Sequence, residues 1–140
     1  MTNLNVKKLT ETAQLPTQAN PLDAGWDLYA DEDVEIWHGE TVLVSTGISL
    51  EIPSGYVGLI WDRSSMGIKG IHRFAGVVDS GYRGEIKVCL FNSNDRPYRV
   101  NSGDRIAQIL IQKVNDFYLR EVESLNETDR GSGGFGSSGI

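Results

Sequence analysis

The sequence has too little cysteine and histidine for the commonest disulfide and metal sites. Cys89 is the single cysteine, and His38 and His72 are the two histidines. One cysteine excludes an intramolecular disulfide, and so few ligands make a thiolate zinc site implausible. Cys89 lies inside the apolar run IKVCLF, which predicts a buried and unreactive thiol.

Long apolar runs and long basic runs are missing as well. No stretch has the length of a membrane-spanning helix, and the N-terminal residues MTNLNVKKLTETAQ lack the apolar centre of a signal peptide. We therefore expect a cytoplasmic protein with no membrane partner. The net charge is −6 without a run of lysines or arginines, so nucleic acid is not an expected partner. A small polyanion fits if arginines converge locally or a divalent cation neutralises its charge.

What the sequence does contain is short alternation of apolar and polar residues. The 140 residues suffice for one domain with a real core. Period-two alternation bounded by glycine, proline, asparagine or aspartate is typical of strands. Strands are expected at Val34 to Trp37, Val42 to Val44, Ile48 to Ile52, Val57 to Trp61, Ile86 to Leu90, Ile106 to Ile111 and Phe117 to Val122.

Helical periodicity is nearly absent. The best candidate is a short helix after Arg63, in SSMGIKG, which its two glycines weaken. Sixteen glycines suit tight turns between strands. The pattern predicts an all-β sandwich or barrel.

The C-terminal stretch TDRGSGGFGSSGI consists mostly of glycine and serine. Its G-x-G-x-x-G spacing is not a dinucleotide-binding loop, because the four residues after Gly136 cannot form the helix that this loop requires. Such composition usually indicates a disordered tail. Its backbone N–H groups could equally wrap phosphates, with Arg130 adding charge.

Four polar sites inside the chain carry chemistry or simple structural roles. Asp79 lies in GVVDSGYRGEIKV, which predicts a β-hairpin arm in which an aspartate is also an ordinary turn residue. Arg63 with Ser64 and Ser65 follows an apolar strand, as a phosphate cradle or a helix cap would.

The amide and carboxylate on neighbouring strands are equally ambiguous. Gln108 is a lone amide on an apolar strand face that is expected to include Ile106 and Leu110. An unpaired buried amide costs about 1–3 kcal/mol, so Gln108 needs a backbone partner, a subunit interface or a ligand. Asp27, between Trp26 and Leu28, suits a turn or an ion pair.

The order of the motifs is more specific than any one of them. AGWDLYA, RSSMG, GVVDSGYRG, GDRIAQILI and RGSGGFGSSG resemble, in sequence, the five motifs of the trimeric dUTPase family, from about Asp23 to Gly139. The resemblance implies a distorted jelly roll that forms a homotrimer whose active sites are shared between subunits. It divides the chain into a β domain at 1–125 and, within the same domain, a flexible lid at 126–140.

The implied reaction is hydrolysis of dUTP to dUMP and pyrophosphate, which would keep uracil out of DNA and supply dUMP for dTMP synthesis. Asp79 matches the general base that activates water against the α-phosphorus, and Gln108 matches the amide that positions this water. Mg²⁺ would be bound by the triphosphate and waters and oriented indirectly by Asp27.

The remaining matched residues would bind substrate. Tyr82 would lie under the deoxyribose and exclude a 2′-hydroxyl. The edge of uracil would pair with the backbone around Gly76, Val77, Val78 and Lys87. Phosphates would contact Arg63, Ser64 and Ser65. From the tail, Phe135 would stack on uracil, Arg130 would meet the γ-phosphate, and Gly136 and Ser137 would donate further hydrogen bonds.

The chain departs from the family pattern at three positions. Asp62 stands where proline or alanine is frequent, Ser65 where glycine is usual, and Arg73 where some members carry asparagine. The alternatives are a dCTP deaminase, which shares the arginine-serine motif, and a trimeric binding module switched by a nucleotide. The D-S-G-Y sequence and the complete tail favour phosphate chemistry over deamination.

Overall fold

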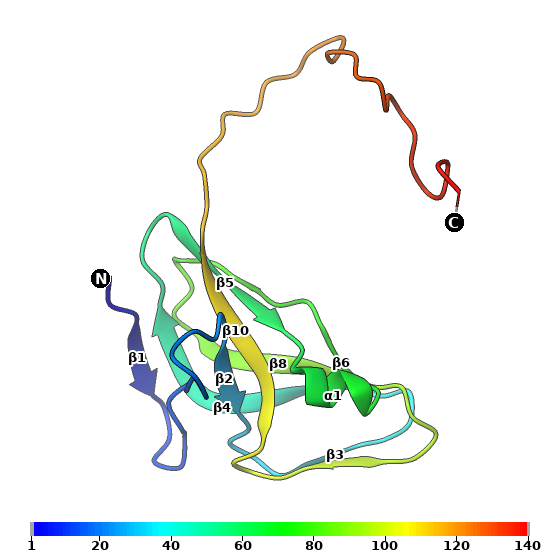
Figure 1. The fold of residues 1–140 in the computed structure, drawn as a ribbon. Coiled ribbons are helices and arrows are strands. Elements are labelled where there is room, and N and C mark those ends of the chain that lie inside the picture. The colour runs from blue at the N-terminus through cyan, green and yellow to red at the C-terminus, as the bar shows by residue number, and fades with distance from the viewer. Residues whose placement is uncertain (1, 140) are drawn as a thin grey trace.

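The computed structural model describes residues 2–139, and strands dominate it (Figure 1). One sheet has the order β1-β4-β8-β6 and a second has the order β2-β10-β5-β7. A two-stranded sheet joins β3 to β9. The strands are β1 (Asn5–Lys8), β2 (Trp26–Tyr29), β3 (Val34–Ile36), β4 (Thr41–Glu51), β5 (Tyr56–Trp61), β6 (Ile71–Phe74), β7 (Val77–Val78), β8 (Glu85–Asn92), β9 (Tyr98–Val100) and β10 (Arg105–Lys113).

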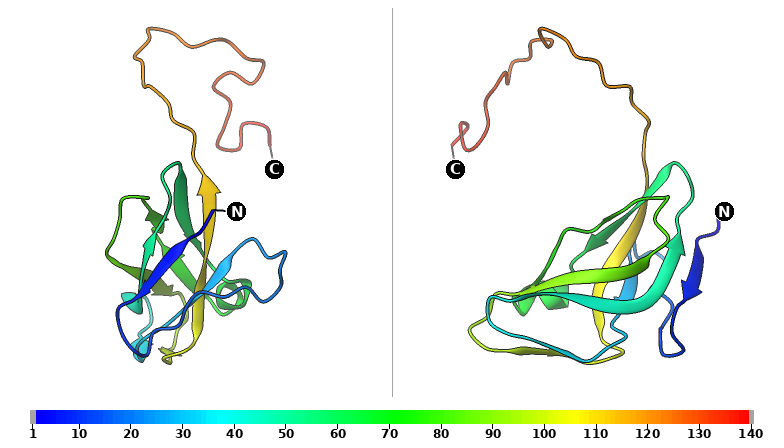
Figure 2. Two further views of the ribbon diagram at one scale, coloured as in Figure 1. Left: turned by 90° about the vertical axis from the view of Figure 1, so that its left-hand side faces the viewer. Right: turned by 180° about the vertical axis from the view of Figure 1, so that it is seen from behind.

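The core lies between the two four-stranded sheets. Ile48 of β4 and Val88 of β8 are buried on one side, and Leu28 of β2 and Ile109 of β10 are buried on the other. Gly58 of β5 allows close packing between the layers, because a Cβ there would lie 2.8 Å from Ile52 Cδ1 and 3.0 Å from Ile109 Cδ1. The prediction of an all-β protein is confirmed, and views from two sides show the layered arrangement (Figure 2).

Among the residues that the structure describes, α-helix is confined to one short element. The helix α1 (Ser64–Ile68) follows β5 at the place that the sequence predicts. Its N-cap residue is Arg63, which makes no side-chain capping hydrogen bond, so neither Ser64 nor Ser65 serves as the cap. Within the described residues, no helix is long and apolar enough to cross a membrane.

Three sequence expectations need correction. Phe117 to Val122 does not form a strand, because β10 ends at Lys113 and the following segment has no strand of this chain beside it. Gln108 does not share a strand face with Ile106 as expected. Ile106 is fully buried whereas Gln108 is partly exposed, because a register shift between Arg105 and Ala107 interrupts the alternation. Cys89 is partly exposed rather than buried.

Candidate active site

A cleft of about 350 Å³ collects one group of the predicted site residues. Its walls come from the end of β6, from β7 and from the start of β8. Six predicted residues line it: Gly76, Val77, Val78, Asp79, Tyr82 and Lys87. Leu43, Phe74 and Cys89 add an apolar wall. The cleft therefore combines an exposed carboxylate with apolar surface, which suits the base and sugar of a nucleoside better than a metal ion.

The backbone enters this cleft through a left-handed turn. Ala75 has a φ of 61° and Gly76 a φ of 124°, and only glycine adopts the second value without strain. A Cβ on Gly76 would also lie 2.9 Å from the carbonyl oxygen of Ile60. The turn delivers Val77 and Val78 to β5, where Gly58 pairs with Val78.

This pairing corrects the expected hairpin. β7 pairs with β5, whereas β8 pairs with β4 and β6. Because β7 is the last strand of its sheet, the backbone groups on its outer side have no strand partner among the described residues. An edge strand of this kind offers fixed N–H donors and C=O acceptors to a ligand.

Tyr82 is held at the mouth of the cleft. Its backbone N–H donates to the carbonyl of Asp79 over 3.0 Å, and its hydroxyl donates to the carbonyl of Glu85 over 2.9 Å. The ring lies over Gly84, where a Cβ would meet the hydroxyl oxygen at 2.4 Å. Two hydrogen bonds therefore fix a half-exposed aromatic ring three residues after the candidate base.

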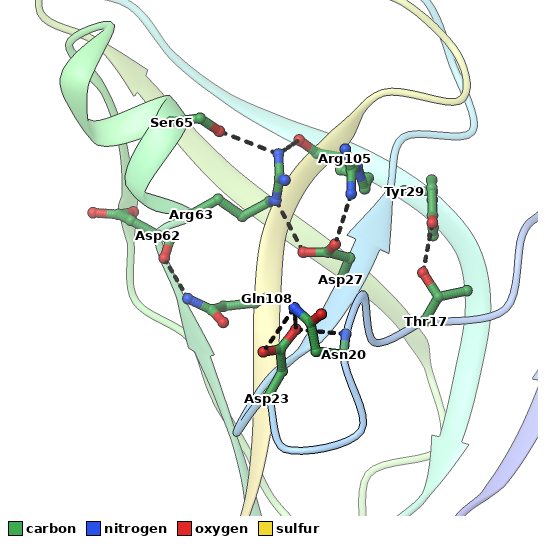
Figure 3. A network of polar contacts seen from close by, with 10 residues as sticks. All are labelled: Thr17, Asn20, Asp23, Asp27, Tyr29, Asp62, Arg63, Ser65, Arg105 and Gln108. Carbon is green, nitrogen blue, oxygen red and sulfur yellow. Dashed lines mark hydrogen bonds and ion pairs between the residues drawn. The ribbon is translucent and has the colours of Figure 1, made fainter.

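A second group of predicted residues forms a polar network on β2, β10 and the start of α1 (Figure 3). Arg63 Nε donates to Asp27 Oδ1 over 2.9 Å, and Arg105 Nη1 donates to Asp27 Oδ2 over 3.3 Å. Arg63 Nη1 also donates to the hydroxyl of Ser65 and to the carbonyl of Arg105, both over 3.2 Å. Two guanidinium groups thus share one carboxylate, which leaves local positive charge for an anion.

Gln108 has the backbone partner that its partly buried position requires. Its Nε2 donates to the carbonyl of Asp62 over 2.9 Å, so Oε1 remains to accept a hydrogen bond from water or ligand. Oε1 lies over the buried Gly25, where a Cβ would approach it to 2.3 Å. Sequence reasoning missed Gly25, although it stands inside the motif AGWDLYA.

The unusual Asp62 turns its charge toward β6. Its carboxylate accepts a hydrogen bond from the backbone N–H of Arg73 over 2.8 Å and pairs with the ring of His72. Arg73 in turn lies over Trp61, with its guanidinium carbon 4.7 Å from the ring centroid. The negative charge at position 62 is therefore engaged by neighbours other than Arg63.

The C-terminal tail does not reach either group within its own chain. After β10 the chain leaves the sheets and runs away from them (Figures 1 and 2). Phe135 is fully exposed. Arg130 Nε donates to the carbonyl of Gly133 over 3.0 Å, and the N–H of Ser137 donates to the carbonyl of Gly134 over 3.0 Å. The structure thus leaves four predicted residues apart from the cleft: Arg130, Phe135, Gly136 and Ser137.

The acidic residues of this chain do not form a metal cage. Between residues 2 and 139, no three histidine, cysteine, aspartate or glutamate side chains gather closely enough to hold an ion. Both oxygens of Asp27 already face guanidinium groups. This donor set fits a cation carried by phosphate oxygens and water, with no more than outer contact to the protein.

Comparison with known proteins places these features in one family. A family model described as dUTPase matches residues 11–139. The deoxyuridine 5′-triphosphate nucleotidohydrolase of Nocardia farcinica is 50% identical over 138 residues, which cover 96% of this chain and 84% of the relative.

Solved structures agree with the sequence comparison. A mutant dUTPase of Staphylococcus bacteriophage 80alpha with dUpNHpp is 29% identical, with a TM-score of 0.94 and full coverage of both chains. A mutant dUTPase from phage phi11 of S. aureus, described with a structural Mg(II) ion, is 27% identical, with a TM-score of 0.84 over 90% of this chain and 100% of that one.

Proposed function

The chain belongs to the dUTPase family and hydrolyses dUTP, and we propose that Asp79 is the general base of this reaction. One observation carries the proposal: a single cleft gathers Asp79 with five other residues expected to contact the nucleoside. An aspartate carboxylate is compact enough to hold one water against a phosphorus atom. Attack of that water on the α-phosphorus releases pyrophosphate and leaves dUMP.

In the proposed reaction, Gln108 positions the attacking water. Because its Nε2 is committed to the carbonyl of Asp62, its Oε1 is the atom that accepts a hydrogen bond from water. A water held by a carboxylate and an amide oxygen has a fixed direction of attack. Its proton passes to Asp79 as the new P–O bond forms, and the bond to the bridging oxygen of pyrophosphate breaks on the opposite side.

The edge of β7 and the ring of Tyr82 select the nucleoside. The backbone groups on the outer side of β7, which do not pair with β5, pair with the uracil edge, whose donors and acceptors differ from those of cytosine. Lys87, on β8 of the other sheet, lines the same cleft. Tyr82 closes the space beside C2′ of the sugar, so a ribose hydroxyl does not fit.

The arginine network binds the triphosphate. Arg63 and Arg105 supply two positive charges against the single carboxylate of Asp27. Phosphate oxygens that approach Ser64 and Ser65 therefore meet hydroxyl groups as well as positive potential. Mg²⁺, held by the phosphates and waters, would withdraw charge from the breaking bond, and Asp27 would orient its waters through outer contacts only.

A trimer with shared sites explains why one chain looks incomplete. The cleft at Asp79 and the pocket beside Arg63 have separate linings, and the tail approaches neither. Exposed apolar side chains such as Val77 and Leu43 also line the cleft, as expected of a surface that a second subunit covers. We propose that residues 126–140 close as a lid over a site formed by neighbouring subunits. A cytoplasmic location stays a prediction from the sequence.

Isotope labelling tests the reaction and its base together. Hydrolysis of dUTP in ¹⁸O-labelled water should place the label in dUMP and leave pyrophosphate unlabelled. Asp79→Asn should still bind dUpNHpp, but it should release pyrophosphate from dUTP about 100- to 10,000-fold more slowly than the wild type. Label found in pyrophosphate would contradict attack on the α-phosphorus, and an unchanged rate in Asp79→Asn would exclude the general base.

A further inference from the structure

The contact between Asp62 and Arg73 joins the two sheets beside the candidate site. Asp62 directly follows β5 of one sheet, and Arg73 lies on β6 of the other. Asp62 Oδ1 accepts the backbone N–H of Arg73 over 2.8 Å and lies 4.0 Å from Nε of the same residue. Both side chains are largely buried, with exposed fractions of 26% and 20%, so solvent screens this pair less than it screens a surface pair.

Each member of the pair holds one part of the proposed catalytic machinery. The carbonyl of Asp62 accepts the Gln108 amide over 2.9 Å. Arg73 Nη1 donates to the carbonyl of Ala75 over 3.1 Å. Ala75 is the non-glycine residue with a φ of 61° at the start of the turn into the cleft. Such a backbone conformation persists only where surrounding contacts maintain it.

Several further contacts keep the pair in one arrangement. The guanidinium of Arg73 rests on Trp61, the residue before Asp62. Asp62 Oδ2 pairs with His72, whose ring packs edge-on against Phe74 with centroids 5.7 Å apart. Within the described residues, Arg73 Nε is buried without a hydrogen-bond partner. A buried donor without a partner needs a compensating contact elsewhere. For Arg73 these contacts are Trp61, the carbonyl of Ala75 and the carboxylate of Asp62.

We propose that Asp62 and Arg73 are positioning residues of the reaction, which together fix the Gln108 amide and the left-handed turn that leads to Asp79. This inference rests on the proposed function, since it assigns a task only if Gln108 and Asp79 act on the nucleotide. Neither residue touches the reacting atoms. Their effect is to keep the direction of the amide and the entry of the cleft constant between turnovers.

The first test needs no catalysis. Hydrogen exchange of the Gln108 side-chain amide is measured by ¹H–¹⁵N spectroscopy, with the resonance assigned by its loss in Gln108→Ala. Asp62→Ala and Arg73→Ala should each accelerate this exchange about tenfold, because displacement of the Asp62 carbonyl removes the acceptor of Nε2. Unchanged exchange in Asp62→Ala would overturn the proposal whatever the enzyme does.

The second test separates positioning from binding. We expect Asp62→Ala and Arg73→Ala to lower kcat about tenfold, less than the hundredfold that a full 1 Å displacement can cause. KM for dUTP should stay within about twofold, as for an interaction that acts in the transition state only. Asp62→Asn keeps an oxygen for the Arg73 N–H and should restore most of kcat. If Asp62→Ala does not fold, Asp62→Asn replaces it in both tests.

Asp33 provides a matched control. It pairs with Arg99 over 3.3 Å and accepts the backbone N–H of Ser102 over 2.8 Å, so Asp33→Ala removes the same kinds of contact away from the site. This variant should change neither the Gln108 exchange nor kcat. Equal losses in the Asp33 and Asp62 variants would reduce the pair to a stabilising role and contradict the proposal.

The two hypotheses fail in different ways. If the wild-type protein releases no pyrophosphate from dUTP, the proposed function is wrong, while the exchange data still judge the pair. If the wild type is active but Asp62→Ala keeps both full kcat and slow Gln108 exchange, only the positioning inference is wrong. The double variant Asp62→Ala/Arg73→Ala should lose less than the product of the single effects, because both residues act through one contact.

Discussion

Arg63 and Asp27 form the shorter of two ion pairs beside the candidate phosphate site, with Nε and Oδ1 2.9 Å apart. Both side chains are mostly buried, with exposed fractions of 22% and 16%. Arg105 contacts the other oxygen of the same carboxylate. Asp27 therefore sets the direction of two cations that would otherwise repel each other.

Replacing Asp27 should lower stability and substrate affinity rather than act on the chemical step. In Asp27→Ala the two guanidinium groups lose their shared partner, and breaking a buried pair in this way costs about 3–5 kcal/mol, less where solvent enters. We expect a lower free energy of unfolding in urea and a KM for dUTP raised about tenfold or more. A KM that stays unchanged while stability falls would restrict Asp27 to a structural role.

Gly25 should be needed for turnover although it carries no functional group. A Cβ at this position would lie 2.3 Å from Gln108 Oε1, so Gly25→Ala must move the amide that we assign to the water. We expect kcat to fall about 10- to 100-fold with little change in KM.

The control for Gly25 lies in its partner. In a Gln108→Ala background the two closest contacts disappear and only the Cβ of residue 108 remains, at 3.2 Å, so Gly25→Ala should then cost little further activity. Multiplying effects in the double variant would show that Gly25 acts through another contact, and the assignment of Gln108 would lose this support.

The raised pKa of Tyr98 should make stability depend on pH in the alkaline range. Burial, with a smaller contribution from the nearby Asp104 charge, raises the pKa of the Tyr98 hydroxyl above its usual 10.0. The folded protein thus binds this proton more tightly than the unfolded chain. The resulting stability is complete below pH 10 and disappears as the pH rises through the pKa of the folded state. Between pH 9 and 11, the free energy of unfolding measured in urea should therefore fall less steeply with pH in Tyr98→Phe than in the wild type.

The strands that can be predicted from the sequence are those with one face in the core. In β8, Ile86 and Val88 alternate with the exposed Lys87 in sequence and are buried in the core. The short β1 and β9 gave no such signal, because exposed polar residues such as Lys7 and Arg99 occupy much of their length. Phe117 to Val122 shows the reverse case. Its alternation suits a strand, but a strand also needs a neighbour, which sequence periodicity cannot supply.

The order of the motifs indicates candidate site residues, but it does not indicate the contacts that hold them. Asp79 and Tyr82 were identified as part of one motif and do line one cleft. The positioning role that we propose for Asp62 could not be predicted from the sequence. Its carbonyl accepts a hydrogen bond from Gln108, 46 residues away in sequence, and its carboxylate accepts one from the backbone N–H of Arg73. Contacts of a backbone carbonyl leave no mark on residue type. Gly25 left only the weak signal of a glycine before a strand.

Mixing two inactive variants tests whether the sites are shared. One variant carries Asp79→Asn, and the other ends before Arg130. Removal of the tail should leave the unfolding temperature nearly unchanged, because the segment after β10 is exposed and lies outside the sheets. It should nevertheless abolish most turnover, since stacking of a base on an aromatic ring such as Phe135 alone contributes about 1–3 kcal/mol.

Hybrid trimers should regain activity that neither parent has. If the base and the lid of one site come from different subunits, random mixing in equal amounts makes about a quarter of the sites complete. The two proteins are unfolded together, refolded and assayed for pyrophosphate release, with each parent refolded alone as the control. If the lid instead closed over the cleft of its own chain, every site would lack either its carboxylate or its tail. Activity that stayed at the level of the separate parents would therefore exclude the shared site.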